Sequence, residues 1–279
     1  GKKIYSDDAA PLFNSLIAIR DYDQAERIVK QQKRSDPNNY RYLVDEAYVI
    51  GLNGNKKKSI KILNKILNNL PAQKNQIIQI TSSLQSKGFA EMAVKVFQKA
   101  QLMSGNNNIY NFEIANAYFY SGDYEKMFDS YIEQLEESGA DIQRIKNKLQ
   151  YVMKMDVNSN LSEMLKTKLL QASQQNPENI QIDEMLLWYS LQTMDFSLAY
   201  RQARSIDIRF GNGDKDMLEL ATIAFSNYDY EVSAKAYEYV KNKENNSPYF
   251  AEAYVGYFLS VLKQVEEKPN ADQKDFKEL

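Results

Sequence analysis

The 279-residue chain contains no histidine and no cysteine. Without a thiol or an imidazole, it cannot supply a cysteine nucleophile, a disulfide, a serine–histidine–aspartate triad, or a zinc site built from histidine or cysteine. The lack of cysteine is compatible with any compartment, so it does not locate the protein. Catalysis by a pair of carboxylates needs neither residue type and stays open.

Long apolar segments and a strong charge of one sign are also absent. No apolar run approaches the roughly 20 residues that cross a bilayer as a helix, and no signal peptide is present. Lysine and arginine number 35 against 37 aspartate and glutamate, which gives a net charge of −2. A near-neutral chain lacks the basic bias expected of a general phosphate-backbone binder.

Glycine is scarce, at ten residues, but its positions are regular. Gly54, Gly88 and Gly122 stand 34 residues apart, and Pro37 and Pro71 keep the same interval. Self-similarity at this period is typical of stacked helix–turn–helix units, each of which cannot bury its apolar face alone. The period therefore predicts a solenoid of helical pairs.

The period also predicts where the helices lie. No stretch shows the sustained apolar/polar alternation of a strand, so the chain is expected to be all-α. After Gly139 the register slips by four residues, which predicts a longer, irregular unit over about 140–177. The prediction is seven helical pairs plus one last helix. The segments predicted in most detail are helices over 40–52, 56–69, near 141–155 and 159–175, pairs over 181–207 and 217–241, and the last helix over 248–265.

Short polar residues precede most of these helices, where their side chains can cap free backbone N–H groups. Asn39, Asn108, Asp141 and Asp214 are the expected caps. Pro11 is expected in the first turn of the opening helix, where a missing N–H does no harm.

The aligned residues resemble the tetratricopeptide repeat (TPR), whose unit is 34 residues. That family prefers a small residue at position 8 of the first helix and an aromatic residue at position 17. The matching residues here are Ala47, Thr81, Ala115, Leu187, Ala221 and Val255 at position 8, and Tyr22, Tyr124, Phe196 and Tyr230 at position 17. Leu187 departs from the pattern. The resemblance implies a right-handed superhelix of antiparallel helix pairs over residues 1–265, with a weak match over 140–177.

A narrower resemblance concerns three segments. The opening KKIYSDDAAPLFNSLIAIRDYDQAERIV, with LPAQKNQII and MLLWYSLQTMDFSLA, is similar to a family of Bacteroidetes TPR proteins that has no assigned function. Members are longer and typically carry a signal peptide. The resemblance implies the N-terminal part of a larger exported protein, periplasmic rather than cytoplasmic. We accordingly expect Gly1 to be an engineered start and the charged residues 266–279 to be a linker.

In the resembled family, the first helices of the pairs line a concave face, which is the usual ligand surface. The resemblance therefore predicts inward-facing residues at four positions of each first helix: Asn14, Tyr48, Asn75, Phe112, Asn116, Phe119, Glu184, Trp188, Phe225 and Tyr249. Aromatic rings beside amide groups suit an extended peptide, since rings supply contact area and amides bond its backbone. Packing between neighbouring helices is an equally valid interpretation of the rings.

Some members of that family bind chaperone C-termini with a clamp of lysine and asparagine, then asparagine, then lysine and arginine, from three successive units. Here Asn14 fits one place, but Ala10, Asp45, Asn75 and Gln79 occupy the others. The clamp is absent, so a chaperone-tail partner is not expected.

No cofactor and no metal site are predicted. The segment FGNGDKD over 210–216 lacks the spaced carboxylates and closing glutamate of a calcium loop, so an inter-repeat turn is expected there. The favoured hypothesis is a non-catalytic scaffold that binds a protein or extended peptide in its concave groove. Two alternatives are a helical-hairpin glycosidase that works through two carboxylates and a helical-repeat binder of single-stranded RNA.

Overall fold

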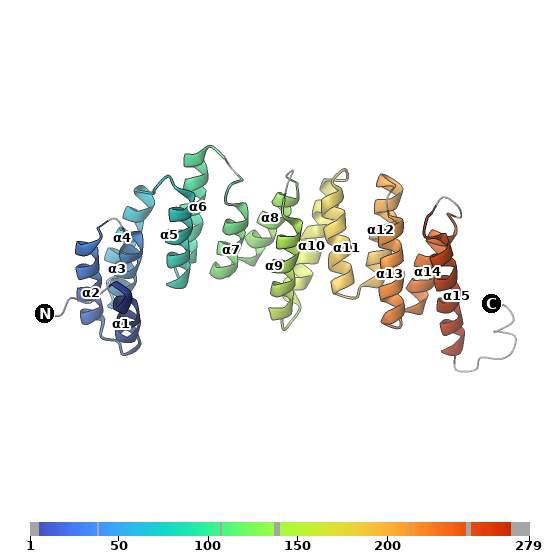
Figure 1. The fold of residues 1–279 in the computed structure, drawn as a ribbon, viewed down its shortest axis with the longest axis horizontal. Coiled ribbons are helices and arrows are strands. Elements are labelled where there is room, and N and C mark those ends of the chain that lie inside the picture. Colours follow the sequence, from blue (N-terminus) through green and yellow to red (C-terminus); the bar gives the residue numbers. More distant parts are fainter. Residues whose placement is uncertain are drawn as a thin grey trace. The chain divides into compact units, whose positions relative to one another are not determined.

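The computed structural model of the chain describes residues 6–37, 39–106, 108–136, 140–211, 213–243 and 247–268. Those residues form fifteen α-helices and no strand (Figure 1). In chain order the helices are α1 (Ser6–Ala18), α2 (Tyr22–Ser35), α3 (Tyr40–Leu52), α4 (Lys56–Asn68), α5 (Lys74–Ser86), α6 (Ala90–Ser104), α7 (Asn111–Ser121), α8 (Tyr124–Leu135), α9 (Ile142–Met155), α10 (Asn160–Gln175), α11 (Ile180–Gln192), α12 (Phe196–Phe210), α13 (Asp214–Ser226), α14 (Tyr230–Lys241) and α15 (Phe250–Glu266).

The predicted all-α class is confirmed in the part of the chain that the structure describes, and so is the order of seven pairs followed by a last helix. The chain divides into two compact units, residues 1–134 and 135–279. In the first unit, α3 packs on α4 and α5 on α6, while the pairs meet through α3 with α5 and α4 with α6. In the second unit, α11 packs on α12 and α13 on α14, and α12 contacts both α13 and α14.

The close approach of the two helices in a pair depends on small residues. Ala47 on α3 and Ala221 on α13 are fully buried. At both places a serine of the second helix donates a hydrogen bond to the alanine carbonyl: Ser59 to Ala47 at 2.7 Å, and Ser233 to Ala221 at 2.9 Å. The apolar cores then fill the space around these crossings, one group of side chains between each helix and its neighbours.

The turn between the two helices of a pair is built in one way throughout. Its tightest residue has positive φ, at Gly54 and Gly88 with φ of 90° and 77°, a conformation that glycine adopts without strain. In the second unit Met194 and Tyr228 occupy this place, with φ of 58° and 65°. Side chains there impose roughly 1 kcal/mol of strain each, which the surrounding packing must offset.

The residue after this turn usually caps the second helix. Asp21, Asn55, Asp195 and Asp229 each accept a hydrogen bond from the backbone N–H three residues further on. These caps satisfy N–H groups that have no partner within the helix. The repeat therefore carries a turn residue and a cap residue side by side.

The caps predicted before the helices are confirmed at two positions and wrong at two. Asn39 caps α3 and Asp141 caps α9 through their side-chain oxygens. Asn108 does not cap α7, because that helix begins at Asn111 and the two residues are linked through the carbonyl of Asn108. Asp214 is itself the first residue of α13, which starts at a glycine N-cap.

The prediction for Pro11 is also wrong. Helix α1 begins at Ser6, so Pro11 lies within the helix rather than in its first turn. Its missing N–H removes one bond from the helical ladder.

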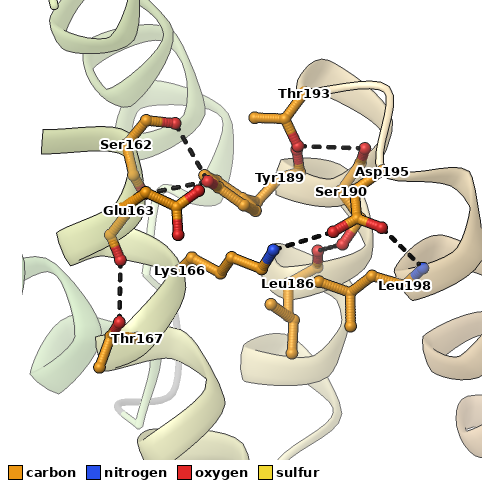
Figure 2. A network of polar contacts seen from close by, with 10 residues as sticks. All are labelled: Ser162, Glu163, Lys166, Thr167, Leu186, Tyr189, Ser190, Thr193, Asp195 and Leu198. Atoms are coloured by element: carbon orange, nitrogen blue, oxygen red, sulfur yellow. Dashed lines mark hydrogen bonds and ion pairs between the residues drawn. The ribbon is translucent and has the colours of Figure 1, made fainter. Parts of the chain in front are cut away.

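A buried polar network joins the irregular pair to the regular repeat that follows it (Figure 2). The hydroxyl of Tyr189, which is 1% exposed, donates to the carbonyl of Ser162 at 3.0 Å and lies 3.0 Å from the hydroxyl of Ser162. Lys166 on α10 pairs with the carboxylate of Asp195 at 2.9 Å. Since Asp195 also caps α12 through Leu198, one carboxylate links α10 to the start of α12.

Replacing Tyr189 with phenylalanine should reveal the contribution of this network. The substitution leaves the buried carbonyl of Ser162 without its donor, so we expect a loss of about 1–2 kcal/mol in the free energy of unfolding. Urea unfolding followed by circular dichroism measures it. Tyr151→Phe, at a ring that is 51% exposed on α9, serves as the control and should leave stability unchanged within error.

The turn over 210–216 is an inter-repeat turn, as predicted, and it is held by a second buried cluster. Asp207 accepts hydrogen bonds from the Gly213 N–H at 3.0 Å, the Tyr239 hydroxyl at 2.7 Å and the Lys243 ammonium at 2.5 Å. Lys243 also pairs with Asp214. A Cβ on Gly213 would lie 2.4 Å from the Cβ of Asp207 and 2.9 Å from its Cα. Only glycine fits this place.

Gly213→Ala should therefore destabilise the second unit. Relief of the clash requires movement of backbone, because the nearest atoms belong to the main chain and Cβ of Asp207, and we expect a loss of about 1–3 kcal/mol. Thermal unfolding measures the loss. Lys215→Ala, two residues further along the exposed face of α13, is the matched control. Equal midpoints for the two variants would contradict the steric explanation.

Candidate functional site

A groove of about 1070 Å³ crosses the first helices of three successive pairs in the first unit. Asn14 comes from α1, a group of residues comes from the start of α3, and the largest share comes from α5. The lining residues are Asn14, Asp36, Asn39, Tyr40, Arg41, Gln76, Ile78, Gln79, Ile80, Ser82, Ser83, Ser86 and Lys87. Most of these side chains are amides or hydroxyls, so the floor of the groove is polar.

Several of the polar side chains have no partner within the protein. Asn14, Gln76, Gln79 and Ser82 are all exposed, and in the described part of the chain none of their side chains makes a hydrogen bond to another residue. An amide offers both a donor and an acceptor, and a hydroxyl does the same. The groove therefore presents unused hydrogen-bonding groups of both kinds along the helices.

One end of the groove carries a buried charge. Asp45 on α3 is 6% exposed, and its carboxylate lies 3.5 Å from the ammonium of Lys87 and 3.9 Å from the guanidinium of Arg41. Lys87 also lies over the rings of Phe13 and Tyr48, at 4.9 and 5.1 Å from their centroids. Burial raises the pKa of Asp45, while Lys87 and Arg41 oppose that shift. A cavity of about 40 Å³ lies beside this group.

A second hollow, of about 710 Å³, lies at the turns of the second unit. Its polar side chains are already engaged within the protein. Asp229 caps α14, Glu231 pairs with Lys235, and the amide of Gln264 donates to the carbonyl of Tyr230. We therefore regard the groove of the first unit as the better candidate site.

No family model matches the chain, and no curated protein matches it. Three solved structures are similar to it. They are a tetratricopeptide repeat protein from Parabacteroides merdae ATCC 43184 (14% identity, TM-score 0.30, covering 90% of this chain and 98% of that chain), the P58(IPK) TPR domain (13%, 0.25, 94% and 99%), and Naa15/Naa10 bound to HypK-THB (12%, 0.30, 92% and 46%).

These superpositions are loose, so the observation that decides the fold is the repeat itself. Arg20 joins Gly54, Gly88 and Gly122 as a residue of positive φ at every 34th position of the first unit. The chain has a TPR-like fold. From Gly122 to Met194 is 72 residues, four more than two periods, which is the slip predicted at the irregular pair.

None of the ten residues predicted on the inner face of the TPR-like chain is buried. Asn14 and Asn75 are exposed and the other eight are half-buried. Asn14 lines the groove, and Tyr48 lies beside Lys87 at its end. Asn75, Phe112, Asn116 and Phe119 belong to the same unit but do not line the groove, and Glu184, Trp188, Phe225 and Tyr249 belong to the second unit. Their role in binding stays a prediction.

Four of the predicted rings also pack against other rings. Tyr48 meets Phe89 edge-on with centroids 6.2 Å apart, and Phe225 meets Tyr230 at 5.2 Å. Phe112 and Phe119 make comparable contacts with tyrosines of α8. These contacts stabilise the helix pairs, so the rings have a structural role whether or not a ligand touches them.

The prediction from TPR positions missed most of the groove. Gln76, Gln79, Ser83 and Ser86 follow one another at intervals of three, four and three residues along α5, which places them on one face of the helix. A search for a polar stripe at helical spacing would have found them. Lys87 has no such signal, because it stands in a turn.

Two carboxylates of the second unit raise one another's pKa. Glu184 on α11 and Asp216 on α13 are half-buried. Burial raises the pKa of Glu184, and the charge of Asp216 raises it further against a smaller opposite effect of Lys146. Burial and the charge of Glu219 likewise raise the pKa of Asp216. In the residues that the structure describes, no group of three acidic side chains is placed to hold a metal ion.

This repulsion predicts a pH dependence. A carboxyl whose pKa is raised by folding loses stability as the pH rises from its ordinary value, 4.5 for glutamate, through the raised value. We expect Glu184→Gln to raise the midpoint of unfolding at pH 7 and to have no effect below about pH 4. Glu178→Gln, on an exposed turn, is the control. A Glu184→Gln effect that persists unchanged at low pH would contradict the electrostatic cause.

In the described residues, no helix is long and apolar enough to cross a membrane.

Proposed function

We propose that this TPR-like chain is a non-catalytic scaffold that binds an extended segment of another protein in the groove across α1, α3 and α5. The unpaired amides and hydroxyl on the floor of the groove support this proposal. An extended peptide exposes a donor and an acceptor at each residue, and such side chains match both.

The charges at the end of the groove add a preference. The side chain of Arg41 is 60% exposed, and its 3.9 Å approach to Asp45 is longer than a hydrogen bond. An acidic side chain of a bound peptide could take a bidentate position on this guanidinium. Lys87, by contrast, is held between two rings and a carboxylate, so it contributes mainly to the shape of the groove.

Within this proposal, the predicted inner-face residues outside the groove extend the contact surface along each unit. The chemistry of the groove gives less support to the alternatives. A glycosidase needs two carboxylates facing one another across a cleft, whereas the buried Asp45 is occupied by Lys87 and Arg41. An RNA-binding surface needs a row of cations, and the groove combines Arg41 and Lys87 with Asp36.

The test is selection of peptides from a phage-displayed library of random 12-residue sequences on the immobilised chain. Enriched peptides are then synthesised and their affinity is measured by fluorescence anisotropy. Ser82→Trp fills the exposed floor of the groove and should lower the affinity at least tenfold. Asn14→Ala and Gln79→Ala each remove one hydrogen-bonding group, and each should weaken binding about fivefold, the equivalent of about 1 kcal/mol.

Lys61→Trp supplies the matched control, since it places the same ring at an exposed position of α4, and it should leave affinity unchanged. Failure to enrich any sequence would overturn the proposal. So would peptides that bind the Ser82→Trp variant as tightly as the wild-type chain.

A further inference from the structure

Helix α15 has two apolar faces, and only one of them is covered. On the inner face Ala253 and Ser260 are fully buried, and Gly256 lies so close to the ring of Tyr237 that a Cβ there would be 2.4 Å from it. On the outer face four large side chains follow one another at helical spacing. They are Tyr254 (58% exposed), Val255 (58%), Phe258 (46%) and Leu259 (44%). We call these four residues the α15 stripe.

The repeat shows what this face normally does. The counterparts of Tyr254, Val255 and Phe258, 34 residues earlier on α13, are Leu220, Ala221 and Ala224. All three are fully buried, and Ala221 accepts a hydrogen bond from Ser233 of α14. On α11 the same positions hold Leu186, Leu187 and Ser190, which are at most 5% exposed. This is the face on which the second helix of a pair packs.

Helix α15 does not turn back at the place where its predecessors do. Helices α11 and α13 are followed by the turn residues Met194 and Tyr228. The equivalent residue, Leu262, lies inside α15, which continues to Glu266. In the part of the chain that the structure describes, no helix covers the α15 stripe. The stripe is therefore a packing surface without its partner.

We propose that a second copy of this chain covers the stripe, with the two α15 helices antiparallel about a two-fold axis. The stripe is free of charge along its centre, so two copies can pack together without burying an ion. Isologous pairing of one surface with itself is the commonest arrangement of homodimers.

Charge at the edge of the stripe selects the antiparallel arrangement. Glu252 and Lys263 are eleven residues apart, which is close to three helical turns, so both lie on the same edge at opposite ends. An antiparallel pair brings Glu252 opposite Lys263 of the partner subunit, and the two-fold axis makes this contact twice. A parallel pair would instead place the two glutamates together. The existing contact of Lys263 with Glu266, at 2.7 Å on the exposed surface, is weak enough to be exchanged.

The contact is small, since one helix face from each copy is less than a standard interface. We therefore expect a concentration-dependent dimer with a dissociation constant on the order of 10 µM. Sedimentation equilibrium of the full chain between 1 and about 300 µM measures it.

Phe258→Asp should shift the dissociation constant upward by at least a hundredfold, because it buries a charge at the centre of the pair. Phe258 is already exposed, so the fold should survive, and circular dichroism checks this. Ile60→Asp, at a 55% exposed apolar residue of α4, is the matched control and should leave the dimer intact. Glu252→Lys should weaken the dimer about tenfold, and adding Lys263→Glu to it should restore most of the affinity.

A chain that stays monomeric up to 300 µM would overturn the proposal, as would a dimer that Phe258→Asp leaves intact. A monomer whose melting temperature falls with Phe258→Asp would show that the same chain covers the stripe, and it too would overturn the proposal. A dimer that responds to Phe258→Asp but is weakened equally by the single and double charge variants would overturn the antiparallel arrangement.

Discussion

The close contact between the two helices of each pair is the constraint on which the other features depend. Alanine at Ala47 and Ala221 allows a serine hydroxyl of the facing helix to reach the carbonyl at those positions. At that separation the turn must be short, which forces positive φ at one residue and leaves the next free to cap the following helix. Packing, turn and cap are thus one unit of information, repeated every 34 residues.

The sequence was sufficient to predict the fold because this information is local. The glycine spacing, the aromatic residues and the small residues located the helices over 40–52 and 56–69 to within one residue of α3 and α4. It also located the four-residue slip. Prediction failed where a long-range contact decides the local role. Asp214 resembles a cap, but Lys243 of another helix binds it.

The candidate site was less predictable for a related reason. Asn14 could be placed from its repeat position, whereas Lys87 reaches the groove from a turn and is held there by Phe13, Tyr48 and Asp45. Those contacts join three helices and leave no regular pattern in the sequence. The aromatic residues were ambiguous in principle, since a half-buried ring such as Phe225 can pack on Tyr230 and still present an edge to solvent.

The groove spans three successive pairs, and this geometry affects how the first unit unfolds. In a linear array each pair contacts only its neighbours, so the ends can fray while the middle stays folded. A guest lying across α1, α3 and α5 would touch all three pairs at once and would have to leave before any of them melted. Occupancy would therefore convert a gradual loss of structure into a single sharp transition.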